Sequence, residues 1–512
     1  MGSNNVQNHV DDDDRFSKLP DDILLHILGK TNIMSSIRAS FSSTRWRHLP
    51  SLLPHIDLSI WDFIHSNNTL TNNKVVDEAM AAMTKAARIC LATPGSERVM
   101  KTASLDLCLS ANYLYDIGEL VCEAIDNSNV KSVELALPTT SQNYDRADMM
   151  RHANNLVCFF DAMHNLFQCT TKLVLYSARF SEFKMHQILN SCEQLQHLEL
   201  NSCDTGYLSV LKIDMPNSKI SYLRLASCCF EKIEFLCLPK LSVLCCESWS
   251  SIGTPLYFGY VPCLEDLSLV CCAAKYQSGL SLSELLHGST SIKVLTLDFY
   301  GEKIWMLPEG KKLCTSFNKL TKMFIHGINV KFGLLWTIAL IEKAPSLKTF
   351  GIEVWNHMCD VDTEENRRVF SKRTNPWQKR NKFKSSGHLQ LERLEFVGFM
   401  VNGISLLNDF DYLRGKIRGG SLKQMCSQMV DIQLLFWNIS KFSSGIWTKR
   451  GLNIGISFSF SLFQTATVPF ILICSTEHRS IKEAVKIQSF YVAFMNEMSV
   501  ATSRLEVANG SR

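Results

Sequence analysis

Aliphatic residues recur along this chain in short bursts that repeat at a nearly constant interval. Three bursts fit the pattern LxxLxLxxC, in which x is any residue. They are Gln194–Cys203 (QLQHLELNSC), Ile220–Cys228 (ISYLRLASC, with Ile at the first position) and Leu264–Cys272 (LEDLSLVCC). Looser copies extend the series in both directions, and most neighbouring copies lie about 21 to 28 residues apart, with two steps near 40. The first residues of the apolar pairs are Leu105, Val133, Leu173, Leu198, Leu223, Leu244, Leu267, Leu295, Met323, Phe350 and Leu394.

A period of this length is typical of leucine-rich repeats, in which each repeat contributes one short parallel strand with its leucine pair directed inward. No single repeat can bury that apolar face, so the repeats must stack on one another. The sequence therefore predicts an α/β protein over about residues 99–400, a curved solenoid whose parallel β-sheet lies on its concave face.

The residues that flank the inward leucines are expected on the concave surface, because successive side chains of a strand point to opposite faces. Their mixture of charged, aromatic and hydroxyl groups suits recognition of a protein better than recognition of one small ligand. The alternative, for any one of them, is a merely solvated position. The candidate target-binding residues are His197, Glu199, Tyr222, Arg224, Asp266, Asp298, Lys322, Phe324, His326, Glu353 and Arg393.

The nineteen cysteines are interpreted as structural thiols. No two of them have CxxC spacing, and the polar start of the chain does not have the pattern of a secretory signal, so neither a zinc site nor a disulfide framework is predicted. Cys203, Cys228 and Cys272 occupy the position of the repeat that requires a small, buried side chain. The sequence also lacks P-loop, GxSxG and HExxH motifs. We therefore expect no metal, no cofactor and no catalytic site.

An amphipathic stretch precedes the repeats, at Leu19–Leu28 (LPDDILLHIL). Pro20 suits a helix start, and the two aspartates after it favour the positive end of the helix dipole. A second helix is predicted over Ile33–Phe41 and a third over Arg45–Leu49, with Trp46 as a large apolar anchor. A unit of about 45 residues buries such apolar stripes poorly by itself, so the module is either a cap on the solenoid or a docking surface.

The other segments complete the predicted organisation. Residues 1–14 form an acidic, disordered leader, and residues 61–98 form a linker or helical cap with a helix over Val75–Leu91. Residues 362–386 form a loop containing the basic run Arg367–Lys384, and residues 401–512 form an atypical tail in which the repeat pattern stops.

The net charge of +4 is small for 512 residues, so no nucleic-acid partner is expected from global charge. The basic run is interpreted as a solvated loop, with a nuclear-import signal and a nucleic-acid patch as alternatives. The uncharged segment Gly451–Thr476 is long enough to cross a bilayer, but polar residues and Pro469 dilute it, so no membrane association is expected.

Residues 14–58 resemble the F-box, the helical motif that docks onto the Skp-type adaptor of cullin-RING ubiquitin ligases. The resemblance rests on DRFSKLPDDILLHIL, IRASFSSTRWRHL and LPHIDL, which follow one another at F-box spacing, although Lys30, Thr31 and Ser42 depart from the family pattern. Together with the repeats, residues 14 to about 400 resemble plant F-box/leucine-rich-repeat proteins, including FBD-type relatives. The resemblance assigns adaptor binding to Leu19, Pro20, Ile23, Ile27, Leu28, Ile37 and Trp46.

By this resemblance, the chain is expected to be a non-catalytic substrate receptor of an SCF-type ubiquitin ligase in the cytoplasm, the nucleus or both. The F-box at residues 15–60 would bind the Skp-type adaptor and, through it, cullin, while the repeats hold an unknown target protein. The alternative is a leucine-rich-repeat scaffold that binds a partner without any ligase.

Overall fold

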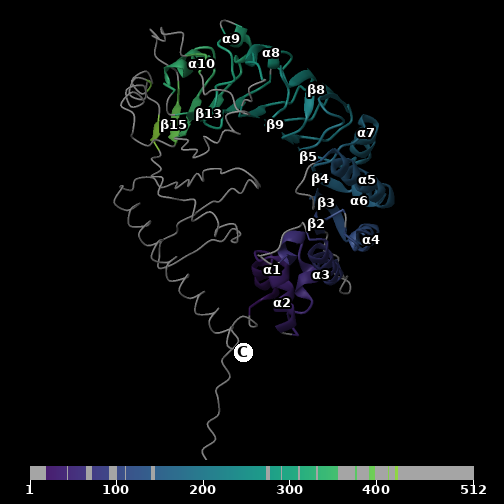
Figure 1. The fold of residues 1–512 in the computed structure, drawn as a ribbon. Coiled ribbons are helices and arrows are strands. Elements are labelled where there is room, and N and C mark those ends of the chain that lie inside the picture. The colour runs from purple at the N-terminus through teal and green to yellow at the C-terminus, as the bar shows by residue number, and fades with distance from the viewer. Residues whose placement is uncertain are drawn as a thin grey trace, which may run out of the picture. The chain divides into compact units, whose positions relative to one another are not determined.

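A computed structural model of the 512-residue chain describes residues 19–42, 44–64, 72–91, 101–109, 111–139, 145–272, 277–289, 291–309, 312–329, 332–355, 375–377, 391–397, 413 and 421–424. The predicted leader and the apolar segment Gly451–Thr476 lie outside these residues. Figure 1 shows helices at the N-terminal end, followed by strands that succeed one another along one sheet, with most helices on its outer side.

The N-terminal module begins with α1 (Asp21–Leu28) and α2 (Ile33–Ser42). Pro20 is the N-cap of α1, as its fixed φ favours, and two aspartates occupy the first turn. At the other end of α1, the hydroxyls of Thr31 and Ser36 both donate hydrogen bonds to the carbonyl of Leu28, at 2.9 and 3.0 Å. The Thr31 N–H donates to the same carbonyl at 3.1 Å, so this end of α1 is satisfied by the backbone and by both hydroxyls.

The third predicted helix is wrong in type and position. Residues 44–48 form turns, and a four-residue 3₁₀ helix, η1 (Leu49–Leu52), follows them. Pro50 explains the shift, because proline has no N–H for an α-helical hydrogen bond and is tolerated only near a helix start.

The main sheet contains thirteen strands among the described residues, and all of its pairs are parallel. This confirms the predicted fold class. In spatial order the strands are β1 (His55–Ser59), β2 (Lys101–Asp106), β3 (Val130–Leu137), β4 (Thr170–Tyr176), β5 (His197–Asn201), β7 (Tyr222–Ala226), β9 (Val243–Glu247), β11 (Asp266–Val270), β12 (Val294–Asp298), β13 (Lys322–Asn329), β14 (Thr349–Trp355), β15 (Arg393–Val397) and β16 (Ser421–Gln424).

The predicted register is confirmed from Leu173 to Leu394, because each predicted first residue pairs with the next one in the series. One position is wrong: Leu135, not Val133, aligns with Leu105 and Leu173. The β2–β3 and β3–β4 pairs each contain a one-residue register shift near their starts, and Val133 aligns with Ala103 instead.

β1 and β16 extend the sheet at both ends beyond the predicted repeats. β1 comes directly from the end of the N-terminal module, and Leu58 on it pairs with Leu105 on β2. β16 pairs with β15, so the sheet continues past residue 400, where the repeat pattern was expected to stop. The N-terminal module is thus joined to the solenoid by the same hydrogen-bonded ladder that joins the repeats.

A left-handed serine follows four consecutive strands of the sheet. Ser177, Ser202, Ser227 and Ser248 have φ between 48° and 54°, and each of their N–H groups donates to a carbonyl in the next repeat at 2.7 to 2.9 Å. This conformation turns the chain out of the strand while the ladder gains one more hydrogen bond. Left-handed backbone costs an L-residue about 1 kcal/mol, so the stacking of repeats must impose it.

The turn explains the buried cysteines. After the left-handed serine, the Cys203 thiol points inward and donates to the carbonyl of Leu175, and Cys228 does the same to Leu200. Burial raises the pKa of Cys203 to about 12, so it is an unreactive thiol. The prediction that Cys272 is the equivalent buried cysteine is wrong, because β11 is not followed by a left-handed residue. Cys271, one residue earlier, is buried instead.

The outer side of the sheet is covered by helices in the first and last repeats and by a second sheet in the middle. The helices are α3 (Asn73–Leu91), which confirms the helix predicted over Val75–Leu91, α4 (Leu114–Asp126), α5 (Arg146–Ala162), α6 (His164–Gln168), α7 (Glu182–Ser191), α8 (Leu282–Leu285), α9 (Lys312–Ser316) and α10 (Ile338–Ile341), with the 3₁₀ helices η2 (Ile60–Phe63) and η3 (Leu335–Thr337). The second sheet was not predicted; its order is β10 (Leu256–Tyr260), β8 (Phe230–Cys237), β6 (Ser209–Asp214).

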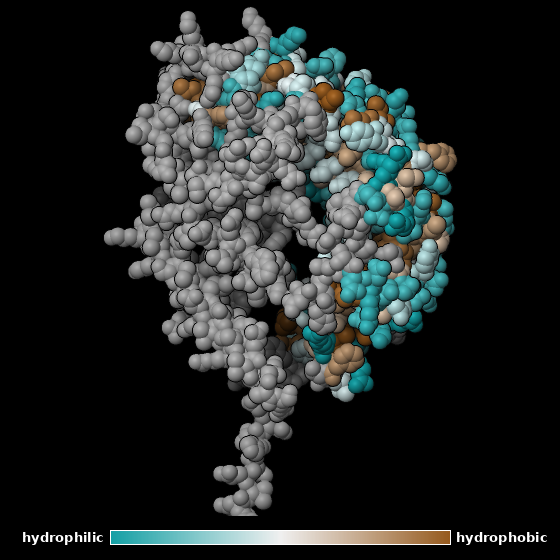
Figure 2. Space-filling model, in the orientation of Figure 1, coloured by the Kyte–Doolittle hydropathy of each residue, from teal (hydrophilic) through white to brown (hydrophobic). Residues whose placement is uncertain are grey.

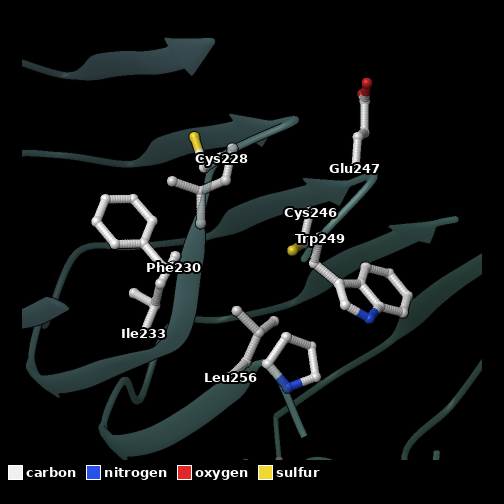
Figure 3. Close-up of a pocket in the computed structure, with 9 residues that line it drawn as sticks. Cys228, Phe230, Ile233, Cys246, Glu247, Trp249 and Leu256 are labelled. Carbon is white, nitrogen blue, oxygen red and sulfur yellow. The ribbon is translucent and has the colours of Figure 1, made fainter. Parts of the chain in front are cut away.

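A small cavity lies between the two sheets, lined by Cys228, Phe230, Cys246, Trp249 and Leu256 among others (Figure 3). Its volume is about 10 Å³, which is room for no more than one water molecule. This interior is a packed core rather than a ligand site.

The centre of the predicted basic loop is anchored rather than solvated. Trp377 is 1% exposed, its indole N–H donates to the carbonyl of Met306 at 3.1 Å, and its ring lies 5.8 Å from that of Trp336. The rest of Arg367–Lys384, except residues 375–376, lies outside the described residues.

Ser227 tests the role of the left-handed turn, because its side chain is exposed and only its backbone conformation is demanding. Glycine adopts positive φ freely and a β-branched residue does not. We expect Ser227→Gly to raise the free energy of unfolding by about 0.5 kcal/mol and Ser227→Val to lower it by about 1–2 kcal/mol. Urea denaturation would measure both, and equal stability of the two variants would contradict the proposed strain.

Candidate functional site

Two surfaces carry the predicted functional residues: the N-terminal module and the outward face of the main sheet. The predicted adaptor-binding residues divide by exposure. Leu28 and Ile37 are buried within the chain's own core, whereas Pro20 and Ile23 are exposed, Ile23 by 44%. Leu19, Ile27 and Trp46 are half-buried. Leu28 and Ile37 therefore stabilise the module itself, and the exposed apolar residues at the start of α1 are Pro20 and Ile23.

The structure also exposes aromatic residues that sequence reasoning missed. Phe41 at the end of α2 is 72% exposed, and Trp61 in η2 is 43% exposed. The buried side of α2 includes Ser36 and Ser40, whose small side chains are almost inaccessible. The exposure of Phe41 could have been predicted from the sequence, because this aromatic residue lies at the end of a helix whose buried side carries serines. Among the residues coloured in Figure 2, hydrophilic ones predominate, and hydrophobic ones form separate spots, some of them in the region of the N-terminal helices.

Arg45 fixes the start of α1 against the turns that follow α2. Its Nη2 donates to the carbonyl of Leu19 at 2.6 Å and to the carboxylate of Asp21 at 2.7 Å, and its Nε donates to the same carboxylate at 3.2 Å. These contacts hold Pro20 and Ile23 at a fixed place on the module.

The outward side chains of the main sheet form three rows, because the ladder aligns the strands residue by residue. Row 1 contains the residues aligned with His197, row 2 those aligned with Glu199, and row 3 the outward residues two positions further along, nearest the carboxyl ends of the strands. The candidate target-binding residues occupy all three rows. Row 1 holds His197, Tyr222, Asp266, Lys322 and Arg393; row 2 holds Glu199, Arg224 and Phe324; row 3 holds Asp298, His326 and Glu353.

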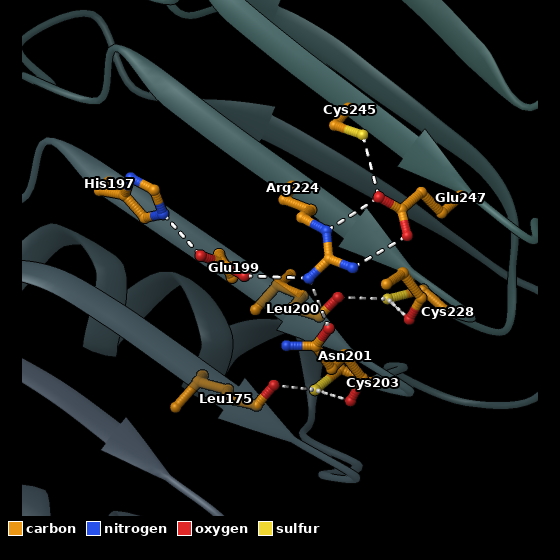
Figure 4. Close-up of polar contacts among 11 residues, drawn as sticks. Leu175, His197, Glu199, Leu200, Asn201, Cys203, Arg224, Cys228, Cys245 and Glu247 are labelled. Atoms are coloured by element: carbon orange, nitrogen blue, oxygen red, sulfur yellow. Dashed lines mark hydrogen bonds and ion pairs between the residues drawn. The ribbon is translucent and has the colours of Figure 1, made fainter. Parts of the chain in front are cut away.

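Arg224 is the centre of an ion network across three strands (Figure 4). It binds Glu247 bidentately, with both distances 2.9 Å, and its Nη1 donates to Glu199 at 3.1 Å. His197 Nε2 lies 2.7 Å from the other oxygen of Glu199, and the Cys245 thiol donates to Glu247 at 3.1 Å. Glu247 was not predicted, although its charge two positions beyond Cys245 was visible in the sequence.

Arg224 is shared between two carboxylates, Glu199 and Glu247. Burial alone would raise the pKa of Glu199, but hydrogen bonds from His197 and Arg224 and the charge of Arg224 outweigh it, so the pKa is lowered. The side chains of Glu199, Arg224 and Glu247 are 16%, 11% and 8% exposed. Glu199 and Arg224 therefore hold strands β5, β7 and β9 together and are largely occupied by one another.

Two aromatic features lie in rows 1 and 2. The rings of His197 and Tyr222 stack with centroids 4.0 Å apart and an angle of 10°. Phe324 pairs with Gly351 on the next strand, and a Cβ at Gly351 would lie 2.5 Å from the Phe324 ring. The missing side chain of Gly351 is what leaves room for this half-buried ring.

His326 and Asp298 pair across β12 and β13 in row 3. Burial lowers the pKa of His326, against the opposing charges of Asp298 and Glu395, while burial raises the pKa of Asp298, against a hydrogen bond from the Tyr300 N–H. At neutral pH the imidazole is therefore uncharged and does not neutralise the carboxylates near it. Lys322 and Arg393 are exposed, and Arg393 forms an ion pair with Glu395.

Within the described part of the chain, the structure contains no group of three His, Cys, Asp or Glu side chains arranged to hold a metal ion. None of the described helices combines the length and the apolar character that crossing a membrane requires.

Comparison with protein families identifies both parts of the chain. Residues 85–406 match the family described as At1g61320/AtMIF1, LRR domain, and residues 16–54 match the F-box domain. The first match begins within α3 and spans the strands from β2 to β15.

Three curated relatives from Arabidopsis thaliana illustrate the similarity. F-box/LRR-repeat protein 25 is 26% identical over 39% of this chain and 72% of its own length. The putative F-box/LRR-repeat protein At5g02930 is 26% identical over 45% of each chain, and F-box/FBD/LRR-repeat protein At5g56420 is 22% identical over 65% of this chain and 76% of its own. The chain thus spans less than half the length of the second relative but about three quarters of the other two.

Removal of Arg224 tests whether the network is structural. Arg224→Met leaves Glu199 and Glu247 buried without their partner, so we expect the free energy of unfolding to fall by about 3–5 kcal/mol. Arg224→Lys should lose less, because it keeps the charge but not the bidentate geometry. The triple variant Arg224→Met, Glu199→Gln, Glu247→Gln should recover most of the loss. Urea denaturation would measure all three, and an Arg224→Met protein as stable as wild type would contradict the assignment.

The lowered pKa of Glu199 predicts a defined pH dependence. A carboxyl group with a depressed pKa in the folded state contributes stability above its unfolded pKa and loses it as the pH falls through the folded value. We expect wild type to be more stable than Glu199→Gln at pH 7, and this difference to shrink as the pH falls below the ordinary range of a glutamate. Unfolding measured for both proteins between about pH 7 and 3 would test this; a difference independent of pH would contradict it.

Proposed function

Because the chain belongs to the plant F-box/leucine-rich-repeat proteins, we propose that it is the substrate-recognition subunit of an SCF-type cullin-RING ubiquitin ligase. The F-box generally binds Skp-type adaptors, and F-box/leucine-rich-repeat families are generally non-catalytic. In this proposal the α1 surface around Pro20 and Ile23 docks on the adaptor, cullin joins through the adaptor, and the concave face binds the target.

The observation that carries the proposal is the continuity between the F-box and the repeats. β1 leaves the F-box and pairs along its whole length with β2 of the solenoid. α3 packs against η1, η2 and α4. A target on the concave face is thereby held in a fixed relation to the adaptor, and a fixed geometry is what a receptor needs to accelerate ubiquitin transfer by proximity.

The exposed residues of the F-box support docking by shape and polarity. Ile23 and Phe41 are large apolar side chains that the chain's own core leaves in solvent. Covering such a side chain contributes about 1.5–3 kcal/mol to binding. Two of the residues that depart from the F-box pattern do not belong to this exposed apolar surface. The Thr31 hydroxyl donates to the carbonyl at the end of α1, and Lys30 is exposed just after that end.

Co-purification with a Skp-type adaptor tests the proposal. We expect wild type to recover the adaptor and Ile23→Asp to recover at least ten-fold less, because a charged group would have to be desolvated in the interface. The matched control is Ile252→Asp, which changes an isoleucine of similar exposure, 51% against 44%, in the solenoid. Thermal unfolding of both variants would show that the fold is retained.

Two outcomes contradict the ligase role. Wild type that recovers no adaptor, or equal recovery by the Ile23→Asp and Ile252→Asp proteins, would favour the alternative of a repeat scaffold that works without a ligase.

A further inference from the structure

The second sheet ends in an open strand edge. β6 is the outermost strand in the order β10, β8, β6, and among the described residues it pairs only with β8. An edge strand directs about half of its backbone N–H and C=O groups away from its sheet. Within the described part of the chain, the backbone groups of residues 210–214 make no hydrogen bond besides those of the pairing with β8. Because a buried backbone group without a partner is costly, the outward groups of this edge face solvent.

The side chains of β6 separate by face. Leu211 and Ile213 are 1% and 2% exposed and belong to the core, whereas Val210, Lys212 and Asp214 are exposed. Neither Lys212 nor Asp214 forms an ion pair with another described residue. An unpaired cation and an unpaired carboxylate therefore stand two residues apart on the outer face of an open edge.

These two charges select one register for a second copy of β6. In an antiparallel pair related by a two-fold axis, the residue at the axis stands opposite itself, and each contact between two other residues occurs twice. With the axis at Ile213, Lys212 of each copy stands opposite Asp214 of the other, at a Cβ separation of about 5 Å, and two ion pairs form. With the axis at Lys212 or at Asp214, two like charges stand opposite each other, which destabilises the pair.

The same register suits the inner face of the strand. Opposed residues must lie on the same face, because side chains alternate with a period of two. With the axis at Ile213, this residue stands opposite itself and Leu211 stands opposite Met215, which is 6% exposed and continues the ladder to β8 through its N–H. A lone lysine on an edge strand opposes pairing. Asp214 reverses that effect only toward a strand with the same charge pattern running in the opposite direction, which a second copy of this chain supplies.

The turn before β6 is held by a buried ion pair. Arg179 binds Asp204 bidentately, at 2.5 and 2.7 Å, and Asp204 also accepts a hydrogen bond from the Gly206 N–H at 3.1 Å. Tyr207, the next residue, is 77% exposed, and Val210 on β6 is 40% exposed. Tyrosine is enriched at protein interfaces. An edge that is already ordered in the free chain also loses little conformational entropy when it pairs.

We propose that the open edge of β6 is a self-association surface, through which two copies of the chain pair antiparallel about Ile213 and join their second sheets into one. This pairing does not depend on the proposed ligase function. Where both hold, one assembly carries two F-boxes and two concave faces, so a target that contains its recognition segment twice gains avidity.

Sedimentation velocity on the full chain tests the pairing. A single strand pairing belongs to the weak class of interfaces, so concentrations up to about 100 μM are needed. We expect wild type to shift from monomer to dimer over this range. Lys212→Asp places carboxylates opposite each other, and Asp214→Lys places ammonium groups opposite each other. Each variant alone should therefore dimerise about ten-fold more weakly than wild type.

Mixing these two variants gives the sharpest result. In a mixed dimer every reversed side chain again meets an opposite charge, so the Lys212→Asp and Asp214→Lys proteins should associate with each other more tightly than either associates with itself. The double variant Lys212→Asp, Asp214→Lys should regain the dimerisation of wild type for the same reason.

The matched controls are Lys319→Asp and Asp161→Lys, which reverse exposed charges outside the second sheet. They should change the dimerisation constant by less than about two-fold, because exposed charges contribute little when they lie outside an interface. Thermal unfolding of every variant would show that the fold is retained.

Three outcomes would overturn the inference: wild type that stays monomeric throughout the concentration range, equal weakening by the β6 variants and the controls, or two β6 variants that do not associate when mixed. Adaptor recovery, measured on the same preparations, separates this result from the ligase role. A monomeric chain that recovers the adaptor keeps the ligase role and loses only the self-association, and a dimeric chain that recovers no adaptor does the reverse.

Discussion

Each strand of the main sheet buries its leucine pair only because the next repeat covers it. Leu58, Leu105, Leu135 and Leu173 stand in one register, and the same line of apolar residues continues to Leu394. No repeat is stable alone, so the chain must continue the ladder until something else covers the last face. At the N-terminal end that cover is the F-box, whose β1 enters the ladder and whose Leu24 and Leu28 join the same core. The stacking requirement thus explains why the F-box is fused to the solenoid and is not tethered by a long linker.

The same constraint orders the concave surface. Since inward positions are fixed by the leucines, every second residue is presented outward in straight rows, and neighbours in a row are one strand apart. Charged residues in such rows must either pair across strands or repel. Arg224 pairs with both Glu199 and Glu247 across three neighbouring strands. This arrangement stabilises the sheet.

Sequence reasoning predicted what the repeat period dictates and missed what local geometry decides. The register from Leu173 to Leu394 follows from spacing alone, as does the place of each candidate residue in a row. The alignment of Leu135 with Leu105 and Leu173 follows from strand pairing that the spacing does not specify, and the burial of Cys271 in place of Cys272 depends on the absence of one left-handed residue. β1 was hidden because His55–Ser59 also fits the end of the F-box pattern, and Pro50 displaced the expected third helix. The second sheet has no counterpart in the period, because the outer segments of repeats follow no common pattern.

Exposure divides the predicted site residues into those that are buried or paired within the chain and those that remain accessible to a partner. Leu28 and Ile37 matched the F-box pattern, yet they are buried in the module, and Glu199 and Arg224 matched the outward pattern, yet they are occupied by each other. A sequence pattern selects all of these alike, because it reports which face a side chain takes and not whether the chain's own residues already cover it. Ile23 and Phe41 on the F-box remain exposed after the chain's own packing is complete. Docking at this end, as proposed above, would therefore depend on apolar surface that the fold itself leaves uncovered.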